Sequence, residues 1–178
     1  MAFFTFSFKL LLERFLQLVK APFVNPDMLW IALPLLLTLI IVELYFGRYR
    51  DEKLGWNTAL TNTLVLVFVS LNLFQQVFRI EGGSFFRATF STGFYIALFI
   101  FVLGISLFLV DFFHLIPSIL AFTISAHLPV NITAYTAIVI VYNMIPLDFA
   151  TLLAWLAIII ILGALFFVIK LLEPKVVR

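Results

Sequence analysis

The sequence predicts an all-α, polytopic membrane protein, and both its composition and its apolar runs support this fold class. Of the 178 residues, 65% are hydrophobic and 11% are charged, and the mean hydropathy is +1.22. A soluble domain usually has about a quarter of its residues charged, so this chain has too few polar side chains to cover a water-facing surface. Several apolar runs approach the roughly 20 residues that a helix needs to cross a bilayer. The runs lack the alternation of membrane strands, and helices satisfy their own backbone groups in lipid.

We predict a single membrane domain over residues 1–178: a helix bundle with about four full spans, a short re-entrant hairpin and an N-terminal amphipathic helix. The amphipathic helix covers residues 3–20. One of its faces is polar and carries Lys9, Glu13, Gln17 and Lys20. The opposite face is apolar, a pattern typical of a helix that lies in the membrane interface.

The first full span is predicted at 28–46, after a helix start formed by Asn25, Pro26 and Asp27. It ends in the polar loop ELYFGRYRDEKLGWNT. The charges of this loop place it in water, and its aromatic rings are typical of headgroup depth.

The second span, 58–80, has a polar stripe along one helical face. The stripe consists of Thr58, Asn62, Asn72, Gln75, Gln76 and Arg79. Because polar side chains are costly against lipid, the stripe is expected to face other helices or water. Two interpretations remain open: it lines a hydrated path, or it makes contacts between helices.

The third span, 91–114, belongs to a longer helix that begins after Ser84. One of its faces carries Gly93, Ala97, Gly104 and Asp111, and small residues there allow close helix packing. The last span is predicted at 149–172, with Asp148 as its N-cap.

Residues 115–147 are predicted to form a broken-helix, re-entrant hairpin, because each of their two apolar runs is short for a full crossing. The tip of the hairpin would be His127–Asn131. Two short full spans are the alternative.

The basic residues predict the orientation. With the N-terminus inside, eight Lys and Arg residues flank the inner ends of the spans and three flank the outer ends. Since cytoplasmic loops are enriched in basic residues, both termini are expected in the cytoplasm of a multi-pass cell-membrane protein.

Ionisable residues at membrane depth often have functional roles, and Glu43, Asp111 and His114 are the candidates. Asp111 and His114 lie three residues apart on a helix, a spacing that suits a proton relay or half of a metal site. Solvation near the helix end is the simpler interpretation. His127 and Asn131 would narrow a path if the hairpin tip lines it, and a plain connecting loop is the alternative.

The sequence argues against enzymatic chemistry. It has no cysteine and two histidines, which excludes disulfides, thiolate metal sites and multi-histidine centres. It also lacks a Walker loop, a G-x-S-x-G elbow and an H-E-x-x-H motif. We therefore expect no catalytic residue, metal or cofactor. The net charge of +2 does not indicate a nucleic-acid partner, because the basic residues flank apolar runs.

The segments APFVNPDMLW and NTLVLVFVSLNL lie on either side of the polar loop. Together these residues, about 20–75, resemble a family of small integral membrane proteins of archaea. The resemblance implies an archaeal cell membrane and brings no activity with it.

We expect a small channel- or transporter-like protein whose polar second span lines the path. The alternative is a structural or assembly subunit of a larger membrane complex, in which the same stripe contacts partner helices. The expected partners are the lipid bilayer and either further copies of the chain or other membrane subunits.

Overall fold

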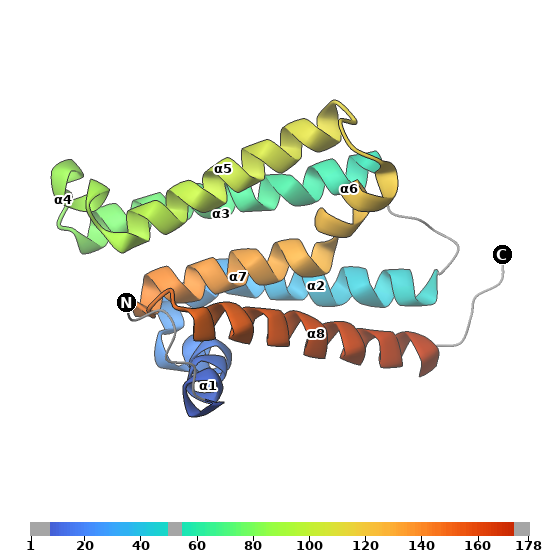
Figure 1. The fold of residues 1–178 in the computed structure, drawn as a ribbon, viewed down its shortest axis with the longest axis horizontal. Coiled ribbons are helices and arrows are strands. Elements are labelled where there is room, and N and C mark those ends of the chain that lie inside the picture. The colour runs from blue at the N-terminus through green and yellow to red at the C-terminus, as the bar shows by residue number, and fades with distance from the viewer. Residues whose placement is uncertain (1–7, 50–54, 173–178) are drawn as a thin grey trace.

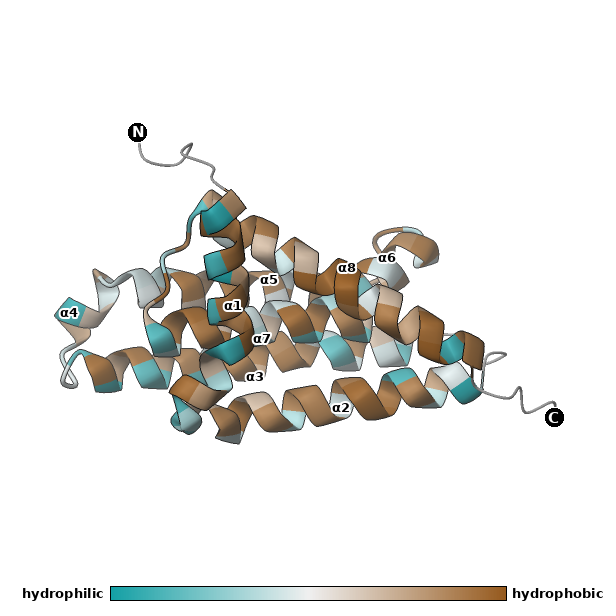
Figure 2. Cartoon of the chain, turned by 90° about the horizontal axis from the view of Figure 1, so that it is seen from below, coloured by the Kyte–Doolittle hydropathy of each residue, from teal (hydrophilic) through white to brown (hydrophobic). Residues whose placement is uncertain are grey.

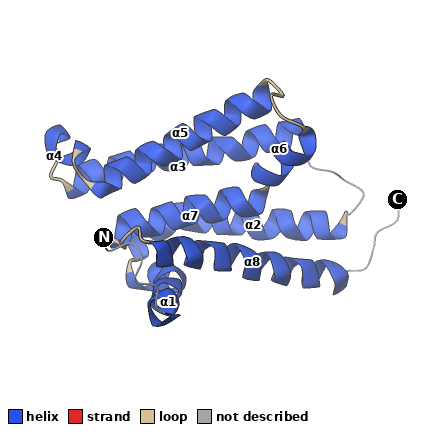
Figure 3. Ribbon diagram, in the orientation of Figure 1, coloured by secondary structure: helices blue, strands red, loops and turns tan. Residues whose placement is uncertain are grey.

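The computed structural model describes residues 8–49 and 55–172, and within these ranges every regular element is a helix (Figure 3). At the N-terminus lie α1 (Phe8–Val24) and the one-turn helix η1 (Pro26–Met28). The long helices that follow are α2 (Leu29–Arg48), α3 (Trp56–Ile80), α5 (Thr92–Phe112), α7 (His127–Asn143) and α8 (Phe149–Leu172). Two short helices, α4 (Phe85–Thr89) and α6 (Ser118–Ile124), precede α5 and α7.

Five helical segments are long and apolar enough to cross a membrane, which confirms an all-helical chain with several candidate spans. They are Pro26–Arg48, Trp56–Ile80, Thr92–Phe112, Ser118–Asn143 and Phe149–Leu172. Successive segments run in opposite directions along the bundle, so the start of α2 and the end of α8 lie at opposite ends (Figure 1).

The outer surface of the bundle is apolar. Large side chains such as Trp30, Phe68 and Ile160 are between 67% and 87% exposed. Hydrophobic residues cover the middle of α2 and α8, while hydrophilic residues gather at their ends and on α1 (Figure 2). An apolar surface of this extent suits lipid and would be costly in water.

The central helix of the bundle is α7. In the most apolar 18 residues of Ser118–Asn143, 67% of residues are buried, against 17% to 33% in the other four candidate spans. This helix packs against α1, α2, α3, α5 and α8. Most of its residues are apolar or small, with no polar face, as expected for a helix surrounded by others.

Residues 115–147 differ from both predicted arrangements, the re-entrant hairpin and two short full spans. α6 begins at the end of the bundle where α5 finishes, and α7 continues to the opposite end (Figure 1). His127–Asn131 therefore form the start of α7 and are not a tip. Pro129 is compatible with this because it is the third residue of the helix, where the backbone N–H has no partner within the helix.

The helix predicted from Ser84 to His114 is divided into two. The hydroxyl of Ser84 accepts from the Arg87 N–H at 3.4 Å, and that of Ser91 accepts from the Phe94 N–H at 3.2 Å. Each serine therefore caps the start of its own helix, α4 or α5. With 21 residues, α5 alone has the length of one crossing.

The N-terminal helix α1 lies across the bundle. It is seen nearly end-on in Figure 1, where α2 and α8 run lengthwise, and it crosses them in Figure 2. It is fixed to α7 by the Tyr135 hydroxyl, which donates to the Leu18 carbonyl at 2.9 Å, and to the start of α8 by the Arg14–Asp148 ion pair at 2.8 Å. A helix in the plane of the membrane interface is expected to have this placement.

Candidate functional site

The polar stripe of α3 makes contacts with other helices at two of its amides. Asn62 is 5% exposed, and its Nδ2 donates to the Ser125 carbonyl at 2.7 Å, where the backbone breaks between α6 and α7. The Asn72 Oδ1 accepts from the Tyr142 hydroxyl at 3.2 Å. Both contacts are hydrogen bonds between helices, which is the packing interpretation of the stripe.

The rest of the stripe lies nearer the two ends of α3. Thr58 and Gln76 are half-buried, and Gln75 is exposed. The exposed Arg79 lies 3.8 Å from Asp27, which is exposed too. The six stripe residues therefore face several different surroundings, and the large cavities of the described chain lie elsewhere.

The predicted ionisable cluster is not assembled. Glu43 pairs with Lys170 of α8 at 2.7 Å. Asp111 is 1% exposed, whereas His114 is exposed and stacks on Trp56 with ring centroids 4.0 Å apart. Over residues 8–49 and 55–172, no ion pair joins Asp111 to His114, and no three His, Asp or Glu side chains gather as metal ligands.

Several buried polar atoms at the α6–α7 break have no hydrogen-bond partner among the described residues. They are the Ser125 hydroxyl, the His127 Nε2 and the Asn131 Oδ1. The Asn131 amide nitrogen donates to the His127 carbonyl at 2.8 Å, within α7 itself. Both carboxylate oxygens of Asp111 are likewise without a partner in the described chain. Asp111 lies on α5, whereas His127 and Asn131 lie on α7. No hydrogen bond or ion pair joins the Asp111 side chain to these residues in the described chain.

An apolar groove with a volume of about 850 Å³ lies between α5 on one side and α7 with α8 on the other. Its lining extends along α5 from Thr92 to Leu107, which corresponds to about 22 Å of helix. Tyr95, Phe99 and Leu152 lie on its exposed rims, with exposed fractions of 47% to 64%. The groove therefore opens sideways and covers most of the depth of a hydrocarbon core about 30 Å thick.

Two hydrogen-bond donors line this groove without a partner. The Thr136 side chain is 6% exposed, and its hydroxyl makes no hydrogen bond to any described residue. The indole Nε1 of Trp155 is buried and is also unpaired within the described ranges. Both donor atoms are covered by protein and do not open into the groove, so the surface that the groove offers to a ligand is almost wholly apolar.

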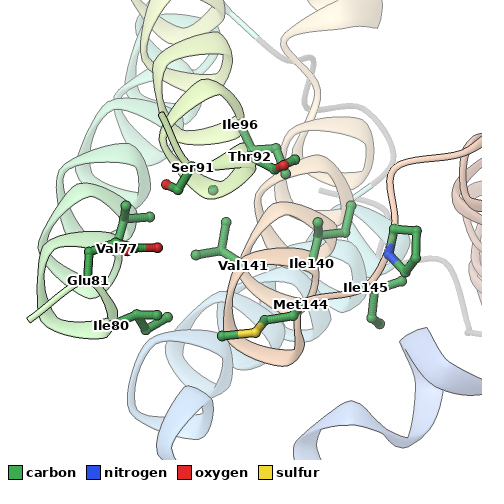
Figure 4. Close-up of a pocket in the computed structure, with 12 residues that line it drawn as sticks. Val77, Ile80, Glu81, Ser91, Thr92, Ile96, Ile140, Val141, Met144 and Ile145 are labelled. Atoms are coloured by element: carbon green, nitrogen blue, oxygen red, sulfur yellow. The ribbon is translucent and has the colours of Figure 1, made fainter. Parts of the chain in front are cut away.

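A second, smaller pocket of about 290 Å³ lies where α3 ends and α5 begins (Figure 4). Its polar lining residues are Glu81, Ser91 and Thr92, and Glu81 is its one charged residue among those described. The Ser91 hydroxyl already donates to the Ala88 carbonyl at 2.8 Å. Glu81 is half-buried and has no ion-pair partner in the described part of the chain.

The sequence patterns did not reveal the groove or the pocket. Thr136 and Trp155 are single polar residues within apolar runs, and nothing in their spacing shows that they face one groove. The one available signal was that each carries a donor at membrane depth. Glu81 and Thr92 lie beside turns, where polar residues are common in any helical protein.

The chain matches no protein-family model, no curated protein and no solved structure. These comparisons give no support to the archaeal resemblance over residues 20–75. Function is therefore inferred from the geometry of the groove and the pocket.

Proposed function

We propose that this integral membrane protein binds the apolar chain of a lipid, or of a lipid-like molecule, in the groove between α5 and the α7–α8 pair. The observation that supports the proposal is the groove itself, which is apolar and opens sideways along most of the length of α5. Ligand sites are typically concave, mostly apolar and about 300–1,000 Å³ in volume, with a few polar groups. The groove has these properties.

The expected channel- or transporter-like role is thereby revised. A path along the polar stripe of α3 has weaker support, because Asn62 and Asn72 are engaged in hydrogen bonds to neighbouring helices. A lipid-like molecule in the lateral groove would be a substrate, a regulator or a structural ligand.

An assembly subunit of a larger membrane complex is the second candidate. A lateral apolar groove also accepts a transmembrane helix. Gln75 adds support, since its amide is exposed on α3, where contact with a partner helix would be more favourable than contact with lipid.

The membrane arrangement belongs to the same proposal. Five antiparallel crossings would place α1 and the end of α8 on opposite sides of the membrane, in place of the two cytoplasmic termini expected from the sequence.

A pair of leucines on α8 tests the proposed function. Leu152 lines the groove and is 47% exposed, whereas Leu156 is 43% exposed and does not line it. We expect Leu152→Trp to fill the groove and to lower the lipid retained per protein several-fold after detergent purification, as measured by lipid extraction and mass spectrometry. Leu156→Trp is the matched control and should retain the wild-type amount.

The result also separates the two candidates. Equal lipid retention in wild type and both variants would contradict lipid binding in the groove. If Leu152→Trp instead dissociates an oligomer or a copurifying protein while lipid retention is unchanged, the assembly-subunit candidate is supported.

A further inference from the structure

The polar pocket adjoins the apolar groove. Thr92, Ile96 and Ile140 line both of them. The Thr92 side chain is exposed and lies beside Ile96 on α5, and Ile140 lies on the facing helix α7 (Figure 4). A single molecule can therefore occupy the pocket with a polar end and the groove with an apolar end.

The pocket lies at the ends of three helices, which is the level of the membrane surface if these helices are spans. Glu81 follows the end of α3, Thr92 begins α5 and Met144 follows the end of α7. The amphipathic helix α1 lies across this same end of the bundle (Figure 1). The pocket is thus placed at headgroup depth, and the groove extends from it into the hydrocarbon region.

The charge of the pocket favours one kind of head. Glu81 is half-buried and unpaired among the described side chains, and the pocket lining contributes no basic residue there. An anionic head would be repelled by this carboxylate, whereas an ammonium group would be attracted to it.

We infer that the molecule bound in the groove is a lipid whose head carries an ammonium group. The head would lie against Glu81 and Thr92, and one chain would lie along α5. This inference rests on the proposed function and adds the class of ligand.

The test uses purified full-length protein in nanodiscs made with equal amounts of phosphatidylethanolamine and phosphatidic acid that carry the same acyl chains. Native mass spectrometry then measures which lipid stays bound. We expect the wild type to retain phosphatidylethanolamine about two- to fivefold over phosphatidic acid, as for a partly exposed ion pair. Glu81→Gln should abolish this preference while total bound lipid is unchanged. Glu13→Gln, an exposed glutamate on α1, is the matched control and should keep the preference.

Each outcome has a distinct meaning. Lipid that is retained with no head preference, or with a preference for phosphatidic acid, would overturn the ammonium site and leave the groove proposal standing. Absence of any retained lipid in the wild type would overturn the proposed function itself.

Discussion

Asp148 joins two helices through both of its carboxylate oxygens. Its Oδ2 accepts from the Arg14 Nε at 3.1 Å and from the Arg14 Nη2 at 2.8 Å. Its Oδ1 accepts from the Thr151 backbone N–H at 2.8 Å and from the Thr151 hydroxyl at 2.9 Å. Burial raises the pKa of the Asp148 carboxyl, but the hydrogen bonds from Arg14 and Thr151 outweigh it and hold the pKa below the ordinary value of 3.8.

We expect Asp148→Ala to lower the free energy of unfolding by about 1–3 kcal/mol at pH 7, because it removes a helix cap and leaves Arg14 unpaired. A lowered carboxyl pKa in the folded state means that this stabilisation is present above the ordinary pKa and is lost as the pH falls through the folded pKa. The difference between the thermal midpoints of wild type and variant in detergent should therefore shrink as the pH is lowered from 7 to 3.

The Asp27–Arg79 pair provides the control for this prediction. Its closest N···O distance is 3.8 Å, and its side chains are 76% and 71% exposed. Asp27→Ala should change the free energy of unfolding by about 0.5 kcal/mol or less, since exposed ion pairs contribute little. A loss as large as that of Asp148→Ala would contradict the special role of the Asp148 contacts.

Single residues were predictable from the sequence where their role is local. Asp148 was predicted as a helix cap, and the Thr151 contacts have the expected geometry. Its partner Arg14 is 134 positions away, so no local pattern indicates the pair. The Glu43–Lys170 pair could not be predicted either, because the two residues are 127 positions apart and only the folded bundle brings them together.

The helices α3 and α5 pack against each other more extensively than any other two described helices, and Gly104 allows their backbones to approach closely. A Cβ on Gly104 would lie 3.0 Å from the Leu66 Cβ and 3.1 Å from the backbone nitrogen of Val67. A Cβ on Gly163 of α8 would meet only the Leu128 side chain, at 3.4 Å. The two glycines are both inside helices and differ in the space around them.

We expect Gly104→Ala to reduce stability by about 1–3 kcal/mol, because the backbone of α3 cannot move away freely. Gly163→Ala should leave stability unchanged or raise it by up to about 1 kcal/mol through helix propensity. Thermal unfolding of both variants in the same detergent measures the difference. Equal effects would mean that α3 and α5 can separate at little cost.

Whole helices were largely predictable. The ends of α2, α3, α5 and α8 lie within two residues of the predicted span ends, because long apolar runs are the strongest signal in a membrane sequence. The start of α7 was missed, because His127–Asn131 was predicted as the tip of a hairpin and instead forms the first residues of the helix. Pro129 and Asn131 are typical helix breakers, yet proline is tolerated in a first turn and Asn131 donates to a carbonyl of its own helix.

The arrangement of the whole chain changes the orientation argument. If all five candidate spans cross the membrane, counting along the sequence puts five of the eleven basic residues beside one set of span ends and six beside the other. The five are Lys9, Arg14, Lys20, Arg79 and Arg87, and the six are Arg48, Arg50, Lys53, Lys170, Lys175 and Arg178. The basic residues therefore no longer favour one orientation, because the predicted excess depended on counting an even number of spans.

The chain has no cysteine, so single cysteines can report the side on which each turn lies. We expect Phe85→Cys and Met144→Cys to react with an impermeant maleimide from one side of the membrane and Leu115→Cys from the other, because Ser118–Asn143 crosses once. A re-entrant hairpin would place Met144 on the same side as Leu115. Labelling after detergent lysis controls for the reactivity of each cysteine.

The burial of α7 has a consequence for how the chain enters the membrane. Its candidate span has a mean hydropathy of 1.6, whereas the following span, Phe149–Leu172, has 3.1. A segment with buried Asn and Thr side chains gains less from lipid contact and depends on neighbouring helices for a favourable environment. One of those neighbours, α8, is synthesised after it. We therefore expect α7 to be held near the insertion machinery until α8 has been made, so that the core of the bundle is completed last.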